Sequence, residues 1–280
     1  MLVLVDVGAR SGIDERWAPF HQHLDVIGFD ADKVECDRLN ASKWPYKVRY
    51  LPHALGSSDG QQVELRICKK PGCSSLLEPN MDFCKNFPYG HNMEVVERRP
   101  MTLSRLDSVL DVQPDVLKID TQGYELEILR GAGKLLDNTL AVELEVEFAP
   151  LYQGQPLFSE LDQFMRSKGF DLIGIRRTLW RRVDSQSPHG GQLVHGDALY
   201  VKQGLQPSEK TKIILQAYKQ HDLLLHLHPD HRFPSPPFHK RLFGGLVTLF
   251  SGMNTNREHR RWVDSLRPSS AIDWHDPDFY

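Results

Sequence analysis

Acidic side chains and glycines gather where two apolar segments near the N-terminus end. The segment LVLVDVGARSG places Asp6 inside an apolar run, and Gly8 and Gly12 lie in the turn that follows. Glycine has no Cβ, so such a turn lets the backbone approach a ligand closely. Asp30 ends the next apolar run, where a carboxylate accepts hydrogen bonds from ribose hydroxyls. The two segments therefore predict a nucleoside site.

The turn departs from the dinucleotide fingerprint GxGxxG. Arg10 stands where the fingerprint has its second glycine, and the expected helix lacks the third glycine. A pyrophosphate-binding turn is therefore disfavoured, and Asp6 suits a cationic ligand that carries an amino acid. S-adenosylmethionine has both properties. The alternative is an ordinary strand, turn and helix with carboxylates at the surface.

A second group of charged residues lies in the segment DVLKIDTQGYELEILRGAGKLL. A strand is expected to end at Asp120, and a turn at Gly123 leads into a helix with Glu125 in its first turn. Negative charge at this end of a helix suits the helix dipole. Side chains alternate along a strand, so Lys118 and Asp120 share one face. The alternative for Glu125 is a role limited to starting the helix.

The next expected strand carries three glutamates on one face, Glu143, Glu145 and Glu147. An isolated buried charge is costly, so Lys118 should pair with one of the carboxylates on these strands. The carboxylates nearest the strand ends are expected to face an open cleft, and a solvated Glu147 is the alternative. A divalent metal between Asp120 and Glu145 is a further alternative, but the spacing does not require one, and no metal ligand is assigned.

These residues need a framework of strands and helices. From residue 2 to about residue 202, short apolar runs alternate with amphipathic stretches, which is typical of an α/β sheet covered on both faces. Helices are expected at 124–136 and 159–168, and an extra strand at 61–68. The last two main strands are joined by a loop too short for a helical crossover, so they should be antiparallel. The seven main strands are expected at 2–7, 25–30, 48–52, 116–120, 140–148, 171–176 and 198–202.

Composition limits the function classes. Lys and Arg total 34 against 37 Asp and Glu, a formal net charge of −3, so no nucleic-acid partner is expected. The four cysteines have no CxxC spacing, and Asp6 and Arg10 interrupt the place of a signal peptide's apolar core, so the protein is expected in the cytoplasm. The longest apolar run, 242–253, is shorter than the roughly 20 residues of a spanning helix, so no transmembrane segment is expected.

Residues 205–280 differ in texture from residues 1–204, and we expect a catalytic domain followed by a C-terminal arm. The arm holds seven of the 13 histidines and the cluster FPSPPF, and a helix is expected at 208–226. No helix precedes the first strand to cover that side of the sheet, so the arm is expected to pack on the domain or on a second copy, as a homodimer. Alternatives are a metal site at His226, His228 and His231 and an interfacial membrane stretch at 243–250.

Seven segments in fixed order resemble the FkbM-type methyltransferase family over about residues 3–202. They are VDVGARSG, GFDAD, HALGSSDG, SSLL, TLSRLDSVL, KIDTQGYELEILRGA and ELEVEFAPLYQGQPLF. The resemblance implies a seven-stranded, Rossmann-like class I methyltransferase fold with one antiparallel strand. It also implies S-adenosylmethionine as cofactor and methyl transfer to a hydroxyl of a sugar, glycolipid or polyketide, a small-molecule or glycan acceptor. This chain departs from the common pattern at Gln122, where many members have Glu, and at Arg10, where a small polar residue is frequent.

The resemblance also implies roles for residues. Cofactor contacts are expected from the first turn, the end of the second strand, the segment after the third strand and the end of the fourth: Asp6, Gly8, Ala9, Arg10, Gly12, Asp30, Ala31, Ala54, Leu55 and Asp120. An alcohol is a poor nucleophile at neutral pH and needs a base. The candidates are Asp120, Glu145 and His91, which lies in a loop, 71–100, expected over the cleft.

Two rival functions remain. One is a nicotinamide-dependent dehydrogenase, which shares the strand, the turn and Asp30 but should show a fuller glycine fingerprint. The other is a methyltransferase-like binding module without catalysis.

Overall fold

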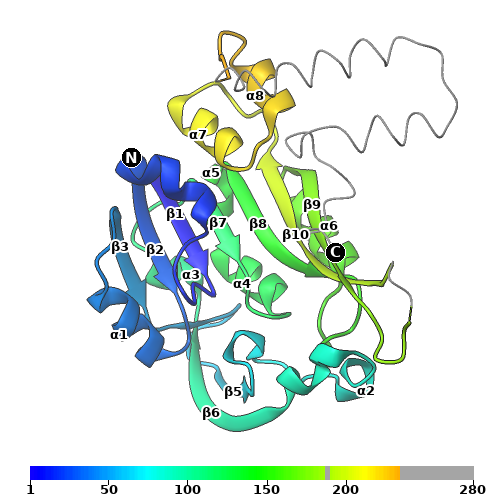
Figure 1. Ribbon diagram of the computed structural model, residues 1–280. Coiled ribbons are helices and arrows are strands. Elements are labelled where there is room, and N and C mark those ends of the chain that lie inside the picture. Colours follow the sequence, from blue (N-terminus) through cyan, green and yellow to red (C-terminus); the bar gives the residue numbers. More distant parts are fainter. Residues whose placement is uncertain (187–189, 234–280) are drawn as a thin grey trace, which may run out of the picture. The chain divides into compact units, whose positions relative to one another are not determined.

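A seven-stranded sheet forms the centre of the protein (Figure 1). The structure, a computed structural model, describes residues 1–186 and 190–233. One compact unit extends from Met1 to Pro229. The strands of the sheet are β1 (Leu2–Val7), β2 (Leu24–Phe29), β3 (Lys47–Leu51), β7 (Val116–Ile119), β8 (Ala141–Glu147), β9 (Phe170–Trp180) and β10 (Gln192–Lys202).

The strand order is β3-β2-β1-β7-β8-β10-β9. The first five strands of this order are parallel, and β10 pairs antiparallel with both β8 and β9. All seven expected strands are present, and the expected α/β fold with one antiparallel strand is confirmed. The last two strands are longer than expected, because residues 177–180 continue to pair with 192–196 beyond the apolar part of the pattern.

The chain leaves β1 toward β2 on one side and returns to β7 on the other. Strand β1 therefore lies at the point where the strand order reverses. In open α/β sheets, ligands bind outside the carboxyl ends of the strands at such a point. The fold thus places the end of β1, the end of β2 and the end of β7 around one potential binding site.

A second, three-stranded sheet has the order β4-β6-β5 and consists of β4 (Ala54–Leu55), β5 (Gln62–Cys68) and β6 (Val95–Ser104). The sequence predicted β5 but not β6, and the expectation of a loop throughout 71–100 is therefore wrong. Leu103 is the only fully buried residue of β6, and the strand contains Pro100, so it lacks an apolar strand pattern. Its antiparallel pairing with β5 defines it instead. The connection contains η2 (Pro71–Cys73), α2 (Met81–Cys84) and η3 (Pro88–Met93).

Short helices connect the strands: η1 (Glu15–His23), α1 (Lys33–Ala41), α3 (Leu106–Val109), α4 (Glu125–Ala132), α5 (Leu135–Asn138) and α6 (Phe158–Ser167). The helix expected after Gly12 is a 3-10 helix, and it contains Pro19, which lacks an amide donor. The expected helix 124–136 is divided at Gly133, whose φ of 51° ends α4. The helix expected at 159–168 is confirmed as α6.

The two faces of the central sheet are covered differently. On one face, an extended apolar cluster joins the strands to α4 and α6, with Val5, Leu129 and Leu161 among its members. On the other face, a cluster near the start of the parallel strands includes Leu4 and Trp17. The carboxyl half of this second face carries charged side chains instead, and these belong to the site described below.

Two helices, α7 (Glu209–Ala217) and α8 (His221–Leu227), follow the sheet. The sequence predicted one helix over 208–226, but the chain turns at Lys219, which has a φ of 54°. Ile213, Ile214 and Ala217 of α7 belong to the second apolar cluster, next to β1. The segment expected to form the arm thus begins within the same compact unit as the sheet.

The remainder of the expected arm, residues 234–280, lies outside the described residues. This includes the proposed homodimer contacts there and the stretch 243–250. Of the residues that the structure describes, only one group of three potential metal ligands lies close together, and it does not contain His226, His228 or His231. Over the same residues, no helix is both long and apolar enough to cross a membrane.

Truncation after Gly204 is expected to destabilise the protein. It removes α7, exposes the apolar cluster and deprives the buried Glu143 carboxylate of the Tyr218 hydroxyl, which lies 2.8 Å away. We expect the free energy of unfolding to fall by about 3 kcal/mol or more, measured by urea denaturation. Truncation after Phe233 retains both helices and serves as the control. An unchanged melting temperature of the protein truncated after Gly204 would show that α7 is dispensable.

Candidate functional site

A cavity of about 720 Å³ opens at the carboxyl ends of β1, β2 and β7. Segment 70–76 and part of the second sheet form its opposite wall. Seven of the ten expected cofactor residues line it: Gly8, Arg10, Asp30, Ala31, Ala54, Leu55 and Asp120. Their convergence on one cavity is consistent with the nucleoside site that the sequence predicted.

The first wall of the cavity is the turn after β1. Gly8 has a φ of 85°, and its amide donates to the carbonyl of Phe29 at 2.8 Å. A Cβ at Gly8 would lie 1.9 Å from the carbonyl oxygen of Asp120. The turn therefore requires glycine on two grounds, the positive φ and the contact with the end of β7. This close approach joins the two strand ends that line the cavity.

Asp30 presents a carboxylate to the cavity at the end of β2. Its Oδ1 accepts from the amide of Asp32 at 2.7 Å, and the Nε of Arg10 lies 3.8 Å from its Oδ2, beyond hydrogen-bond distance. Burial raises the pKa of Asp30, while the Asp32 amide and Arg10 oppose that rise. Oδ2 is thus held in place and is available to accept from a ligand hydroxyl.

Arg10 forms its short contact with Asp32, at 2.9 Å between Nη2 and Oδ2. This explains how an arginine is accommodated where the family frequently has a small polar residue. The guanidinium lies along the cavity wall, held by the N-cap residue of α1.

The other three expected cofactor residues, Asp6, Ala9 and Gly12, do not line the cavity. Asp6 is only 2% exposed, and its Oδ1 lies 3.3 Å from the Nζ of Lys118. A Cβ at Gly12 would lie 2.7 Å from the ring of Trp44. These residues support the turn from behind rather than contact a ligand in the cavity.

Asp120 lies at the carboxyl end of β7, beside the Gly8 turn, with 33% of its side chain exposed. Its Oδ2 lies 3.7 Å from the Nζ of Lys118, and its Oδ1 accepts from the Nε2 of Gln122 at 3.0 Å. The carboxylate is therefore fixed from two sides while one face remains open to the cavity.

Gln122 occupies the position where many family members have glutamate. Its amide nitrogen donates to both Asp120 and Glu145, and its Oε1 accepts from the hydroxyl of Tyr152 at 3.1 Å. Its backbone has a φ of 61°, and its carbonyl accepts from Ser75 at 2.7 Å. An amide can bridge two carboxylates, whereas a glutamate here would add a further negative charge.

Lys118 pairs with Asp6 and Asp120 rather than with one of the three glutamates of β8. In the sheet register Asp6 lies directly beside Lys118, on the neighbouring strand. Burial alone would lower the pKa of Lys118, but the adjacent carboxylates raise it overall. The ammonium is therefore a structural countercharge for both carboxylates, Asp6 and Asp120.

Glu145 and Glu147 do not face an open cleft, contrary to expectation. Glu145 is 8% exposed and Glu147 only 1%, so the alternative of a solvated Glu147 is wrong as well. Neither lines the cavity, because an apolar cluster that includes Leu151 and Tyr152 covers this end of the sheet. Burial raises the pKa of both carboxyls well above the ordinary range.

His195 was not among the expected site residues. Its Nδ1 lies 3.1 Å from Oε1 of Glu145, so contacts run from Asp120 through Gln122 and Glu145 to His195. Burial lowers the pKa of His195. The alternation in LVHGDALY, which places His195 and Asp197 on one strand face, is the signal that could have found it.

His91 does not lie over the cavity. It is exposed in η3, and its Nδ1 lies 2.7 Å from the carbonyl oxygen of Pro88 in the same turn. It does not line the cavity, so the geometry gives it no contact with a bound ligand. Lys70, Ser75 and Arg99, which the sequence did not single out, line the wall instead.

The sheet order, the antiparallel β10 and the cavity at the strand reversal define a Rossmann-like methyltransferase domain. The profile of the Methyltransferase FkbM domain matches residues 6–172, more than half of the chain. The chain belongs to this family. S-adenosylmethionine is the cofactor of the domain, and the nicotinamide-dependent alternative is set aside.

Solved structures are similar to the chain at low identity. An FkbM methyltransferase from Methylobacillus flagellatus KT is 14% identical, with a TM-score of 0.39 over 71% of this chain and 43% of that one. Magnesium protoporphyrin IX methyltransferase from Synechocystis PCC 6803, solved with bound S-adenosylmethionine, is 10% identical, with a TM-score of 0.39 over 72% of this chain and 70% of that one. The chain thus covers less than half of the first structure. No curated protein sequence matches it significantly.

Proposed function

We propose that the protein transfers the methyl group of S-adenosylmethionine to a hydroxyl oxygen of a sugar, glycolipid or polyketide acceptor. The observation that supports this most strongly is that Asp30 and Asp120 line one cavity from the ends of β2 and β7, the strands on either side of β1. One carboxylate suits the ribose, and the other is placed for the reacting hydroxyl. The acceptor class rests on the family resemblance.

The residues of the cavity fit the cofactor. The glycine turn at Gly8 brings the end of β1 against the carbonyl of Asp120, and both residues line the cavity. Asp30 offers its Oδ2 at the end of the neighbouring strand β2, while its Oδ1 accepts from the amide of Asp32. Ala54 and Leu55 add an apolar surface suited to adenine. When bound, the cofactor supplies an electrophilic methyl group on a sulfonium.

Asp120 is the proposed base. Methyl transfer is an in-line displacement, so the protein must align the hydroxyl oxygen and accept its proton as the new C–O bond forms. Of the three candidates, only Asp120 lines the cavity. Glu145 acts on it through the Gln122 amide and is a positioning residue.

A transfer assay tests the proposal. Purified protein is incubated with S-adenosylmethionine labelled in the methyl group and with a panel of monosaccharides, glycolipids and polyketides. We expect labelled methyl ether in at least one acceptor class, identified by mass spectrometry. Cofactor binding without transfer to any acceptor would instead support the non-catalytic binding module.

Replacing Asp30 with alanine is expected to weaken cofactor binding by about 1 to 3 kcal/mol, the effect of losing hydrogen bonds to a charged group. Calorimetry measures the affinity for S-adenosylmethionine. Asp37→Ala is the control, because Asp37 is an exposed carboxylate of α1 that pairs with Lys33. Equal affinities of the Asp30 variant and the unmodified protein would remove Asp30 from the cofactor site.

A further inference from the structure

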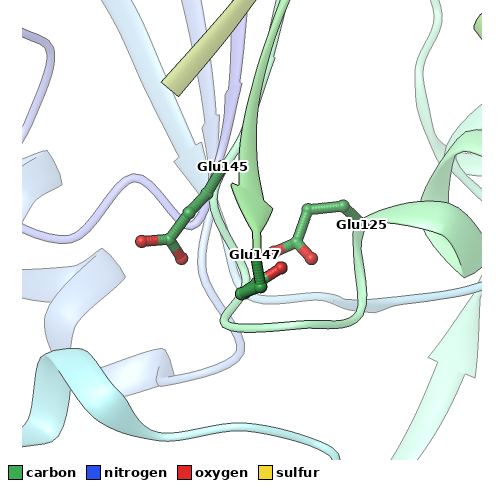
Figure 2. A group of neighbouring side chains, drawn as sticks. All are labelled: Glu125, Glu145 and Glu147. Atoms are coloured by element: carbon green, nitrogen blue, oxygen red, sulfur yellow. The ribbon is translucent and has the colours of Figure 1, made fainter. Parts of the chain in front are cut away.

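Three buried glutamates meet at the end of β8, behind the cavity. One carboxylate oxygen from each of Glu125, Glu145 and Glu147 lies within 4.8 Å of the other two. Figure 2 shows the carboxylates of Glu125 and Glu147 turned toward one another. Both residues are only 1% exposed. Three carboxylates at this separation, shielded from water, repel one another unless protons or an opposite charge neutralise them.

The oxygens of the cluster differ in how they are satisfied. Oε1 of Glu125 accepts from the amides of Thr121, at 2.7 Å, and Gly123, at 3.1 Å. Glu145 contacts Gln122 and His195. In contrast, Oε2 of Glu125 and both oxygens of Glu147 are buried without a hydrogen-bond partner among the described residues. Glu147 is thus a buried side chain of the cluster whose two oxygens have no hydrogen-bond partner among the described residues.

Glu143, in the same strand, is a buried glutamate whose charge and hydrogen bonds are satisfied by protein groups. It shares the strand face with Glu147 and is 3% exposed. Arg16 lies 3.1 Å from its Oε1, and the hydroxyl of Tyr218 donates to its Oε2 at 2.8 Å. Protein groups satisfy both oxygens of Glu143, whereas Glu147 has neither a cation nor a donor on its oxygens within the part of the chain that the structure describes.

We propose that Glu125, Glu145 and Glu147 bind a divalent cation of the Mg²⁺ or Mn²⁺ type. Such hard cations prefer carboxylate oxygens, and two oxygens on one Mg²⁺ lie at most about 4 Å apart, twice the metal–oxygen distance. The three oxygens of the cluster lie within 4.8 Å of one another, close to this limit. The structure thereby replaces the pair Asp120 and Glu145, which the sequence suggested for a metal, because the Gln122 amide bridges those two.

The cation site lies behind the cavity and does not line it, since none of its three glutamates does. It holds Glu145, whose carboxylate accepts from the amide of Gln122, and Gln122 in turn holds Asp120. The cation therefore neutralises buried charge and fixes the wall of the cavity. Its binding can be measured without knowledge of the methyl acceptor.

Titration of the chelator-treated full-length protein with Mn²⁺ tests the site. We expect one bound Mn²⁺ per chain by electron paramagnetic resonance, and a melting temperature about 5 to 10 °C higher at a Mn²⁺ concentration of about 100 times Kd. Glu147→Gln should weaken Mn²⁺ binding about tenfold or more, because ligand charge sets the affinity of such sites. The matched control Glu143→Gln should bind Mn²⁺ as the unmodified protein does.

The sign of the stability change separates a cation site from a cluster that holds only protons. In chelator, Glu147→Gln should melt at or above the temperature of the unmodified protein, because it removes a buried carboxyl that must either bind a proton or carry a charge without a partner. With Mn²⁺ the order should reverse. If Mn²⁺ leaves the unmodified protein unchanged, or binds Glu147→Gln equally well, the proposal is overturned. Glu125→Gln, with the same expectations, decides the matter if Glu147→Gln does not fold.

Discussion

Replacing Gly8 with alanine is expected to abolish binding of S-adenosylmethionine and to lower the free energy of unfolding by more than about 3 kcal/mol. The new methyl group would lie 1.9 Å from the carbonyl oxygen of Asp120, a backbone atom that cannot move aside without shifting the end of β7. The φ of 85° adds strain for any residue with a Cβ. Both effects act at the meeting point of the two strand ends that form the cavity.

Gly60→Ala is the matched control for this experiment. Gly60 also has a positive φ, 77°, but a Cβ there would meet no atom within 4 Å. It should therefore cost only the backbone term, about 1 to 2 kcal/mol, and leave cofactor affinity unchanged. Urea denaturation and calorimetry measure the two effects. A folded Gly8 variant with unchanged affinity would contradict the role assigned to the turn.

Replacing Asp120 with asparagine is expected to lower turnover about 100- to 10,000-fold, the usual contribution of a general base. The amide retains the size of the side chain and its acceptor oxygen toward Gln122, but it cannot take the proton of the acceptor hydroxyl. Affinity for S-adenosylmethionine should change little, because an interaction that acts mainly in the transition state appears in the rate. The assay uses the acceptor that the transfer screen identifies.

The Asp30 variant provides the opposite pattern in the same assay. At saturating cofactor, Asp30→Ala should retain most of its turnover while its affinity falls, since Asp30 is assigned to the ribose. Asp120→Asn should do the reverse. An Asp120 variant with normal turnover and weak cofactor binding would identify Asp120 as a cofactor ligand and remove it as the base.

Local patterns were sufficient for the framework of the fold. Apolar runs of strand length identified the seven strands of the central sheet, and the short loop before β10 predicted its antiparallel pairing. The turn at Gly8 and the acids Asp30 and Asp120 were recognisable because each directly follows the last residue of a strand. These features depend on neighbours in sequence, so the sequence carries them directly.

Long-range packing determines the two features of the fold that sequence patterns did not predict, strand β6 and the division of α7 from α8. Strand β6 has few buried residues of its own and becomes a strand by pairing with β5, about 30 residues earlier, and with the short strand β4. The division of α7 from α8 at Lys219 likewise has no proline or glycine to mark it. In both cases the local preference is weak, and tertiary contacts determine the backbone.

The sequence by itself determined the fold class, the nucleoside-type turn and the acids at the strand ends, because periodicity and glycine placement are local properties. Only the tertiary structure decided how the charges are satisfied. Lys118 pairs with Asp6 across 112 positions of sequence, and Gln122 reaches Glu145. Glu147, which alternation alone could not tell from a solvated residue, is buried. Side-chain alternation fixes the face of a sheet on which a charge lies, but the segments packed over that face determine whether the charge meets water, a partner or a cation.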